Sequence, residues 1–417
     1  MSRQDALLER FLRYVAVPTQ SDPKAKVVPS NPNEFKLAEL LAEELRALGL
    51  VDIEISEYAV LTAKLPGNLP EGRKAPVIGW MAHMDTVNTG LSPEIHPRVV
   101  KNYQGGDICL NKEKDIWLRT AEHPEIERYI GDDIVVSDGT SVLGADDKSA
   151  IANVMTALSI VVEENRPHGD IYVAFVPDEE LGEKGARKTD LKKFPVDFAY
   201  TIDCCELGEV VWETFNAGNA KLTVKGVTAH PMASKGVLVN PILVVHDFIN
   251  MLDRGETPEY TEGREGFIVL KTLEANPSTA VLTMKIRDHN KKLYEAKKAK
   301  LVAAAEYLRV RHPKAKIEIE LSDSYANIAD AVRDDNRMGI DYLYKALETA
   351  GVEAKTTAMR GGTDGSYLSV VGLLTPNYFT GAHNFHSNCE FLPMKSWEKS
   401  LEVTLALIDI AANAEKA

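Results

Sequence analysis

The feature that most constrains this chain is a set of short apolar runs that lead directly into carboxylate and imidazole side chains. Residues 75–82 precede His83, and residues 171–176 precede the pair Glu179 and Glu180. Apolar runs of this length are typical of strands that are buried on both faces of a sheet. Because sites in open α/β sheets form beyond the carboxyl ends of the strands, these side chains are expected to converge. The residues expected at the convergence are His83, Asp85, Asp146, Asp147, Glu179, Glu180, Asp203 and His386.

The segments between these runs have the spacing of amphipathic helices. Apolar residues recur at helical intervals in residues 33–48, which end at Gly49, and again in residues 149–162. The N-terminal residues up to Arg13, with Leu7 and Phe11 on one face, are also predicted to be helical. Strands that alternate with helices predict an α/β sheet covered by helices on both faces.

The middle of the chain predicts a second, smaller domain. Its expected elements follow the order β-α-β-β-α-β, which is typical of ferredoxin-like α+β units. The α/β pattern resumes after it, so the insertion interrupts the first domain. For a chain of 417 residues we therefore predict a catalytic α/β domain at 1–214 and 322–417, with an α+β lid domain at 215–321. The elements of the insertion are expected at residues 221–227, 240–252, 266–270, 280–287, 291–311 and 316–321.

Composition and charge argue against several classes of protein. A net charge of −14 disfavours nucleic acid and anionic membranes as partners. The sequence has no apolar run near the roughly 20 residues that span a bilayer. The N-terminal helix carries interspersed charges and lacks a cleavage site of small residues, so we expect a cytoplasmic protein. The four cysteines have no CxxC spacing and are expected to be reduced thiols.

The types of the converging residues indicate zinc chemistry. Imidazole and carboxylate groups are good zinc ligands, and a catalytic site leaves one position open for water. The carboxylates exceed what one ion needs, whereas two ions that share a bridging carboxylate would use them. Of the adjacent Glu179 and Glu180, one can bind metal while the other acts as a general base. Asp85 lies two residues beyond His83, within reach of the imidazole N–H. HExxH, the motif of single-zinc peptidases, is absent from the sequence.

Several strings of residues together resemble the M20 metallopeptidase family. The strings 81–86 (MAHMDT) and 144–148 (GADDK), with Glu179–Glu180, Asp203 and His386, carry this resemblance. Other strings are similar to the peptidase T group of that family, and the likeness runs from Thr19 almost to the C-terminus. These strings are KGVTAHP at 225–231, ASKG at 233–236, YTEGREGF at 260–267, YAN at 325–327 and RGGTDG at 360–365.

The resemblance implies an aminopeptidase that binds two zinc ions and releases the N-terminal residue of tripeptides, with Mn²⁺ or Co²⁺ as possible substitutes for zinc. It also implies that Glu179 is the general base, that Asp85 orients His83, and that the Asp146–Asp147 peptide bond is cis. The implied ligands of one ion are His83, Asp146 and Asp203. The implied ligands of the other ion are Asp146, Glu180 and His386. The implied substrate-binding residues, which would hold a short peptide, are His230, Arg287, Arg360 and Asn240.

The sequence also departs from the pattern of the peptidase T group. Cys204 and Cys205 follow Asp203 where small glycines are usual, so they would narrow the pocket or make it sensitive to oxidation or to soft metals. His383 stands three residues before His386 where an aromatic residue is usual, so it competes as a ligand candidate. The asparagine and phenylalanine that precede His386 match the family, which favours His386.

Other functions are compatible with the same set of residues. A dipeptidase, a carboxypeptidase or an N-acyl amino acid deacylase would use the same metal chemistry with a differently shaped pocket. A non-catalytic binding protein on this fold would be expected to lack some of the ligands or Glu179, and all of them are present. The sequence fits either a monomer or a homodimer.

Overall fold

The structure, a computed structural model, describes residues 2–414, which divide into two compact units. Unit 1 is formed by Met1–Trp212, Ala331–Thr357 and Thr363–Ala417. Unit 2 is formed by Glu213–Asp330 and Ala358–Gly362. Met1 and residues 415–417, which the predicted domain ranges include, lie outside the described part of the chain.

Unit 1 is built on a mixed β-sheet. Its strands are β1 (Val51–Ile55), β2 (Leu61–Leu65), β3 (Ile78–His83), β8 (Ile171–Val176), β9 (Phe198–Cys204), β10 (Glu209–Glu213), β15 (Lys355–Ala358) and β16 (Asn377–Phe379). They lie in the order β1-β2-β8-β3-β9-β16-β10-β15. The central strands β8, β3, β9 and β16 pair in parallel, whereas β1, β2 and β10 pair antiparallel. The parallel strands β8, β3 and β9 are the apolar runs that precede the candidate ligands.

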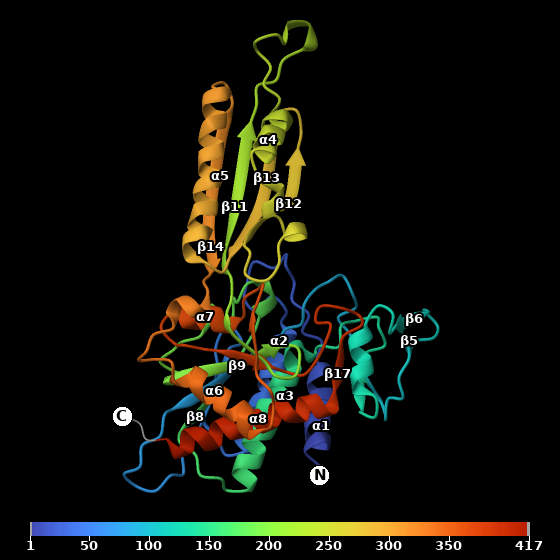
Figure 1. The fold of residues 1–417 in the computed structure, drawn as a ribbon, viewed down its shortest axis with the longest axis vertical. Helices are drawn as coiled ribbons and strands as arrows, with labels where there is room; N and C mark the ends of the chain where they lie inside the picture. The colour runs from blue at the N-terminus through green and yellow to red at the C-terminus, as the bar shows by residue number, and fades with distance from the viewer. Residues whose placement is uncertain (1, 415–417) are drawn as a thin grey trace. The chain divides into compact units, whose positions relative to one another are not determined.

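Helices cover both faces of this sheet, as predicted. The helices of unit 1 are α1 (Arg3–Val15), α2 (Asn33–Ala47), α3 (Ala145–Glu163), α6 (Met338–Thr349), α7 (Asp364–Val370) and α8 (Met394–Asn413). On one face, Tyr378 of β16 hydrogen-bonds Thr404 of α8, and α8 packs with α1 and α3 (Figure 1). On the other face, Leu368 of α7 packs against Met81 and Ala199. In the described chain, no helix is both long and apolar enough to cross a bilayer.

A smaller group of strands comes mainly from residues 98–136, between β3 and α3 in the sequence, and one further strand joins it from residues 391–393. A three-stranded sheet has the order β17-β7-β4, and a hairpin joins β5 to β6. The bounds are β4 (Arg98–Val100), β5 (Ile108–Asn111), β6 (Ile116–Leu118), β7 (Ile134–Val136) and β17 (Phe391–Pro393), with a 3₁₀ helix η1 (Pro124–Tyr129) between β6 and β7. These strands are short and mixed in composition, so no periodic pattern marks them.

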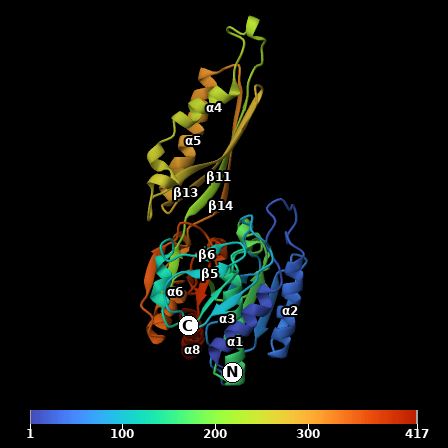
Figure 2. The same cartoon turned by 90° about the vertical axis from the view of Figure 1, so that its right-hand side faces the viewer.

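Unit 2 has the predicted β-α-β-β-α-β order. Its elements are β11 (Asn216–Lys225), α4 (Pro241–Asn250), β12 (Phe267–Ala275), β13 (Thr279–Asp288), α5 (Lys291–Arg311) and β14 (Lys316–Tyr325). The antiparallel sheet has the order β12-β13-β11-β14, and both helices cover one of its faces (Figure 2). β12 and β14 continue beyond their predicted ends. The prediction stopped too early because the outer parts of these strands are largely polar and show no apolar alternation.

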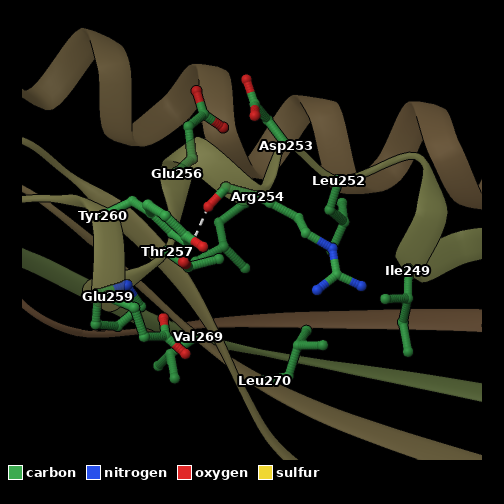
Figure 3. Close-up of a pocket in the computed structure, with 12 residues that line it drawn as sticks. Ile249, Leu252, Asp253, Arg254, Glu256, Thr257, Glu259, Tyr260, Val269 and Leu270 are labelled. Carbon is green, nitrogen blue, oxygen red and sulfur yellow. Dashed lines mark hydrogen bonds between the residues drawn. The ribbon is translucent and has the colours of Figure 1, made fainter.

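A cavity of about 220 Å³ lies within unit 2, between the end of α4 and β12 (Figure 3). Ile249, Leu252 and Leu270 supply apolar walls, and Arg254 and Glu259 supply charged groups. None of the candidate metal ligands lines this cavity. The chemistry predicted for the chain therefore lies elsewhere.

Candidate metal centre

The candidate ligands of unit 1 lie at the ends of neighbouring elements. His83 is the last residue of β3, and Asp203 lies near the end of β9. Glu180 belongs to the short 3₁₀ helix Glu179–Leu181 (η2) that follows β8. Asp146 lies in the first turn of α3. Gly144, the N-cap residue of this helix, has a left-handed φ of 74°. Because β3, β8 and β9 are parallel neighbours, their carboxyl ends bring these residues to one edge of the sheet.

Asp146 lies at the centre of the cluster, between two histidines. One carboxylate oxygen, Oδ1, is 2.8 Å from Nε2 of His83. The other, Oδ2, is 2.9 Å from Nε2 of His386, and the same nitrogen is 2.9 Å from Glu180 Oε1. A carboxylate that presents one oxygen to each of two ligand groups has the arrangement of a bridge between two ions. The peptide bond between Asp146 and Asp147 is cis.

The structure brings the predicted ligands together and adds Asp147 to them. Two groups have ligand atoms within 4.8 Å of one another and could each hold an ion: the first is His83, Asp146 and Glu180, and the second is Asp146, Asp147 and Asp203. The predicted sets paired His83 with Asp203 and Glu180 with His386. Asp146 belongs to every one of these sets, and the division of the remaining ligands between two ions stays a prediction.

The electrostatics of the cluster fit a bound cation. Asp147 is buried, and its Oδ1 has no hydrogen-bond partner among the described residues. Burial raises the pKa of Asp147 and of Asp203 well above the usual range, and nearby carboxylates add to the effect. Burial lowers the pKa of His386, but hydrogen bonds to Asp146 and Glu180 outweigh it and raise that pKa to about 11. The cluster therefore favours positive charge, which a divalent metal would supply to these nitrogen and oxygen donors.

Asp85 connects the ligands to the turn that carries Glu179. Its Oδ1 accepts a hydrogen bond from the backbone N–H of Glu179 at 2.9 Å, and its Oδ2 accepts one from that of Glu180 at 3.3 Å. Nδ1 of His83 is 3.0 Å from the carbonyl oxygen of Asp85 and 3.3 Å from its Oδ1. Asp85 is fully buried, so these contacts are protected from water. They orient the His83 ring with Nε2 toward the cluster.

Glu179 has the environment of a general base. It lies beside Glu180 on η2, and burial raises its pKa well above the usual value, although His83 opposes this. The nearby carboxylates of Asp364 and Asp203 raise the pKa further. A carboxylate with a raised pKa accepts a proton more readily near neutral pH, which suits general-base catalysis.

Two residues that hold the ligands in place were missed by the sequence analysis. Glu390 is buried, and its carboxylate accepts hydrogen bonds from the backbone N–H groups of Leu143, Gly144 and Asp146, at 2.7, 3.0 and 3.2 Å. Asn377 accepts the N–H of Asp203 through Oδ1 at 2.7 Å. Each residue acts on backbone N–H groups that lie far from it in the sequence, so the sequence offered no signal for its role.

A third supporting residue, Glu34, did have a signal in the sequence. It lies on the buried face of α2 with Leu37 and Leu41, where a charged residue is unusual. Its Oε2 accepts the backbone N–H of Asp178 at 3.2 Å, directly before Glu179. Burial raises the pKa of Glu34 to about 10. A buried carboxyl group at a core position of a helix therefore marks a contact that supports the turn before Glu179.

His383, which competed with His386 as a ligand candidate, lies away from the cluster. Its ring stacks on Phe391, with the ring centroids 4.8 Å apart, and its Nε2 is 2.6 Å from the hydroxyl oxygen of Tyr129. Burial lowers the pKa of His383 to about 4. The structure thus places His386 among the candidate ligands and His383 in an aromatic cluster.

Cys204 is buried at the end of β9, and its neighbour Cys205 is half-buried. The backbone N–H of Cys205 donates to Glu209 at 3.0 Å. Burial raises the pKa of both thiols, so they are held in the protonated form, which reacts poorly.

The predicted substrate-binding residues all belong to unit 2. His230 is exposed, and its Nδ1 accepts the backbone N–H of Met232 at 3.2 Å. Asn240 caps α4 by accepting the N–H of Ile242 at 3.0 Å. Arg287 donates to the carbonyl oxygen of Gly218 at 3.2 Å. These three side chains keep polar groups that a ligand could use.

Arg360 is more fully engaged within unit 2. Its Nη1 donates to the carbonyl oxygens of Gly263 and Glu265 at 3.1 and 2.8 Å, and its Nη2 donates to the hydroxyl of Thr261 at 2.8 Å. The guanidinium also lies near the rings of two phenylalanines. These contacts give Arg360 a structural role in unit 2, and its role in binding a substrate carboxylate stays a prediction.

Comparison with known proteins places this site in a family. The sequence pattern of peptidase family M20/M25/M40 matches residues 143–410, well over half of the chain. A peptidase T-like protein of Rhizobium meliloti is 50% identical over 412 residues, which cover 99% of this chain and all of that protein. The chain is a metallopeptidase of the M20 family.

Members of the M20 family with the name peptidase T are more distant but equally complete matches. Peptidase T of Clostridium botulinum is 42% identical over 410 residues, which cover 98% of this chain and 99% of that one. The crystal structure of aminopeptidase PepT from Bacillus cereus superposes with a TM-score of 0.77 at 20% identity, covering 98% and 99% of the two chains. A tripeptidase from Staphylococcus aureus gives the same TM-score at 21% identity, covering 99% of each chain. The two structures confirm the fold, including the inserted α+β domain.

Proposed function

We propose that this chain is an aminopeptidase with two zinc ions that releases the N-terminal residue of tripeptides. The observation that carries the proposal is the position of Asp146, with one carboxylate oxygen facing His83 and the other facing His386. Glu179, the candidate base, lies beside Glu180, which contacts the same His386. The names of the peptidase T relatives support the choice of tripeptides.

The residues of the cluster fit zinc because they offer two imidazole nitrogens and several carboxylates. Bound zinc ions would lower the pKa of a water molecule toward ~7 and polarise the scissile carbonyl group. Mn²⁺ and Co²⁺ accept the same donors and would be substitutes. The proposed holders of the ions are His83, Asp146, Glu180, Asp203 and His386, with Asp147 as a further carboxylate within reach.

In the proposed reaction, Glu179 takes a proton from the attacking water and gives it to the amine that leaves. This type of proton transfer contributes roughly 10²–10⁴-fold to the rate. Asp85 contributes by contacting both the His83 ring and the backbone of Glu179. These contacts fix the position of the proposed base relative to one proposed metal ligand. His230, Arg287, Arg360 and Asn240 remain the proposed contacts to the peptide; guanidinium groups pair well with a terminal carboxylate.

The experiment that tests the proposal is hydrolysis of trialanine, dialanine, tetraalanine and N-acetyl-trialanine by the zinc-loaded protein. We expect cleavage of trialanine at its N-terminus and poor cleavage of the other three. Cleavage of dialanine or of the acetylated peptide instead would assign the chain to dipeptidases or deacylases of the same family. If all four peptides stay intact although two zinc ions are bound, the peptidase proposal is wrong.

A further inference from the structure

His386 differs from the other candidate ligands in the element that carries it. His83 and Asp203 lie on strands, whose regular hydrogen bonding fixes their backbones. Asp146 lies at the start of α3 with non-helical backbone angles, and its N–H is held by the buried carboxylate of Glu390. His386 lies in a loop before β17, with a left-handed φ of 63°, and its side chain is 48% exposed. The position of this ligand therefore depends on contacts that hold the loop.

Asn384 provides such contacts two residues before His386. Its side-chain Nδ2 donates to Oε1 of Glu125 at 2.9 Å and to the carbonyl oxygen of Cys389 at 3.2 Å, and it lies 3.1 Å from Nδ1 of His123. One amide group thus ties the beginning of the loop to its end and to residues 123–129. Asn384 itself has a φ of 58°, which asparagine tolerates better than most residues.

His383 makes a second connection between the loop and residues 123–129. Its Nε2 is 2.6 Å from the hydroxyl oxygen of Tyr129, the last residue of η1. Tyr129 also packs edge-on against Phe391, on which His383 stacks. The loop is therefore attached to η1 at two consecutive residues, by an amide at 384 and by an aromatic contact at 383.

We propose that Asn384 is a positioning residue, which holds His386 against Asp146 and Glu180 by tying its loop to residues 123–129. In this arrangement, the small β4–β7 region supports one metal position of the pair and not the other. The inference rests on the proposed role of His386 as a zinc ligand. Its consequence is selective: loss of the Asn384 contacts weakens the zinc position that uses His386 and spares the position that uses Asp203 on β9.

The test is a zinc titration of the metal-free protein in competition with a coloured chelator, which resolves two binding constants. Asn384→Gly is the main variant, because glycine accepts the left-handed backbone and removes the amide contacts, although it also adds backbone freedom to the loop. Glu125→Ala removes one acceptor and is the second variant. The matched control is Glu127→Ala, which removes an exposed carboxylate from the same turn.

We expect Asn384→Gly to weaken the zinc position that uses His386, which is the position lost in His386→Ala, by about 10–100-fold, the range typical for partners of metal ligands. The other position should stay within about twofold. Glu125→Ala should give a smaller loss at the same position, and Glu127→Ala should bind zinc like the unmodified protein. Equal weakening of both positions, or no weakening of either, would overturn the inference. If Asn384→Gly does not fold, the same criteria apply to Glu125→Ala.

A further variant separates this inference from the proposed function. His386→Ala should remove one of the two zinc positions. If it does not, the assignment of His386 as a ligand fails, whatever the behaviour of Asn384. If His386→Ala removes a position while Asn384→Gly and Glu125→Ala match the unmodified protein, the ligand assignment stands and the positioning role of Asn384 is refuted.

Discussion

Replacement of Asp85 by asparagine tests how the buried carboxylate supports the centre. The carboxylate of Asp85 accepts the N–H groups of Glu179 and Glu180, at 2.9 and 3.3 Å, and faces Nδ1 of His83 at 3.3 Å. Asparagine has the same shape but only one acceptor oxygen, so an NH₂ group would face one of these backbone N–H donors. The substitution also removes the negative charge that faces the imidazole.

The size of the expected fall in kcat/KM follows from the hydrogen bond that the substitution removes. A hydrogen bond to a charged group contributes about 1.5–3 kcal/mol, and one such bond is lost. A change of about 1.4 kcal/mol corresponds to a factor of ten, so the expected fall in kcat/KM is about 10–100-fold. The same range is typical when partners of metal ligands are removed. Zinc affinity at the position that uses His83 should fall together with kcat/KM.

The assay compares trialanine hydrolysis and zinc titration for Asp85→Asn and for a control, Asp190→Asn. Asp190 is exposed, and among the described bonds its side chain accepts one from the backbone N–H of the neighbouring Lys192. The control should behave like the unmodified protein. A kcat/KM for Asp85→Asn within about threefold of the unmodified value would refute the reasoning, because the buried hydrogen bonds would then have no effect on the reaction.

Three further predictions follow from the site. Glu179→Gln should lower kcat by about 10²–10⁴-fold while two zinc ions still bind, as metal analysis of the purified variant would show; a fall in bound zinc would make Glu179 a ligand instead. Removal of zinc with a chelator should abolish hydrolysis and lower the melting temperature, and added zinc should restore both; an unchanged melting temperature would argue against an ion in the acidic cluster. The pKa of His383 is lowered to about 4, so between pH 4 and 6.5 the unfolded chain binds a proton that the folded chain does not. Stability should therefore rise with pH in this window, and His383→Phe should remove up to about 1.4 kcal/mol per pH unit of that slope in urea unfolding of metal-free protein. An unchanged slope would show that His383 titrates normally.

The parts of the fold that follow from local pattern could be predicted from the sequence. The central strands β3, β8 and β9 are continuous apolar runs because both of their faces are covered, and each leads into a candidate ligand. The helices of unit 2, and the order in which its helices and strands follow one another along the chain, could also be predicted from periodicity. Convergence of the ligands was predictable because parallel strands end at the same edge of a sheet.

The supporting contacts could not be predicted in the same way. β16 has only three residues, and its pairing with β9 depends on long-range contacts that no local period encodes. Glu390 and Asn377 act through backbone N–H groups that lie far from them in sequence. The roles of His383 and His386 depended on the path of one loop, which turns the first ring onto Phe391 and the second toward Asp146.

The order of the chain has a consequence for how the protein is made. Unit 1 is assembled from separate stretches, and β16, which lies between β9 and β10 in the sheet, comes from the last of them. His386 and Glu390 are synthesised after β16, when almost all other residues have left the ribosome. A nascent chain therefore carries His83, Asp146 and Glu180 long before it can close the second half of the centre. We expect hydrolytic competence to arise only after His386 and Glu390 have been synthesised and have folded against Asp146.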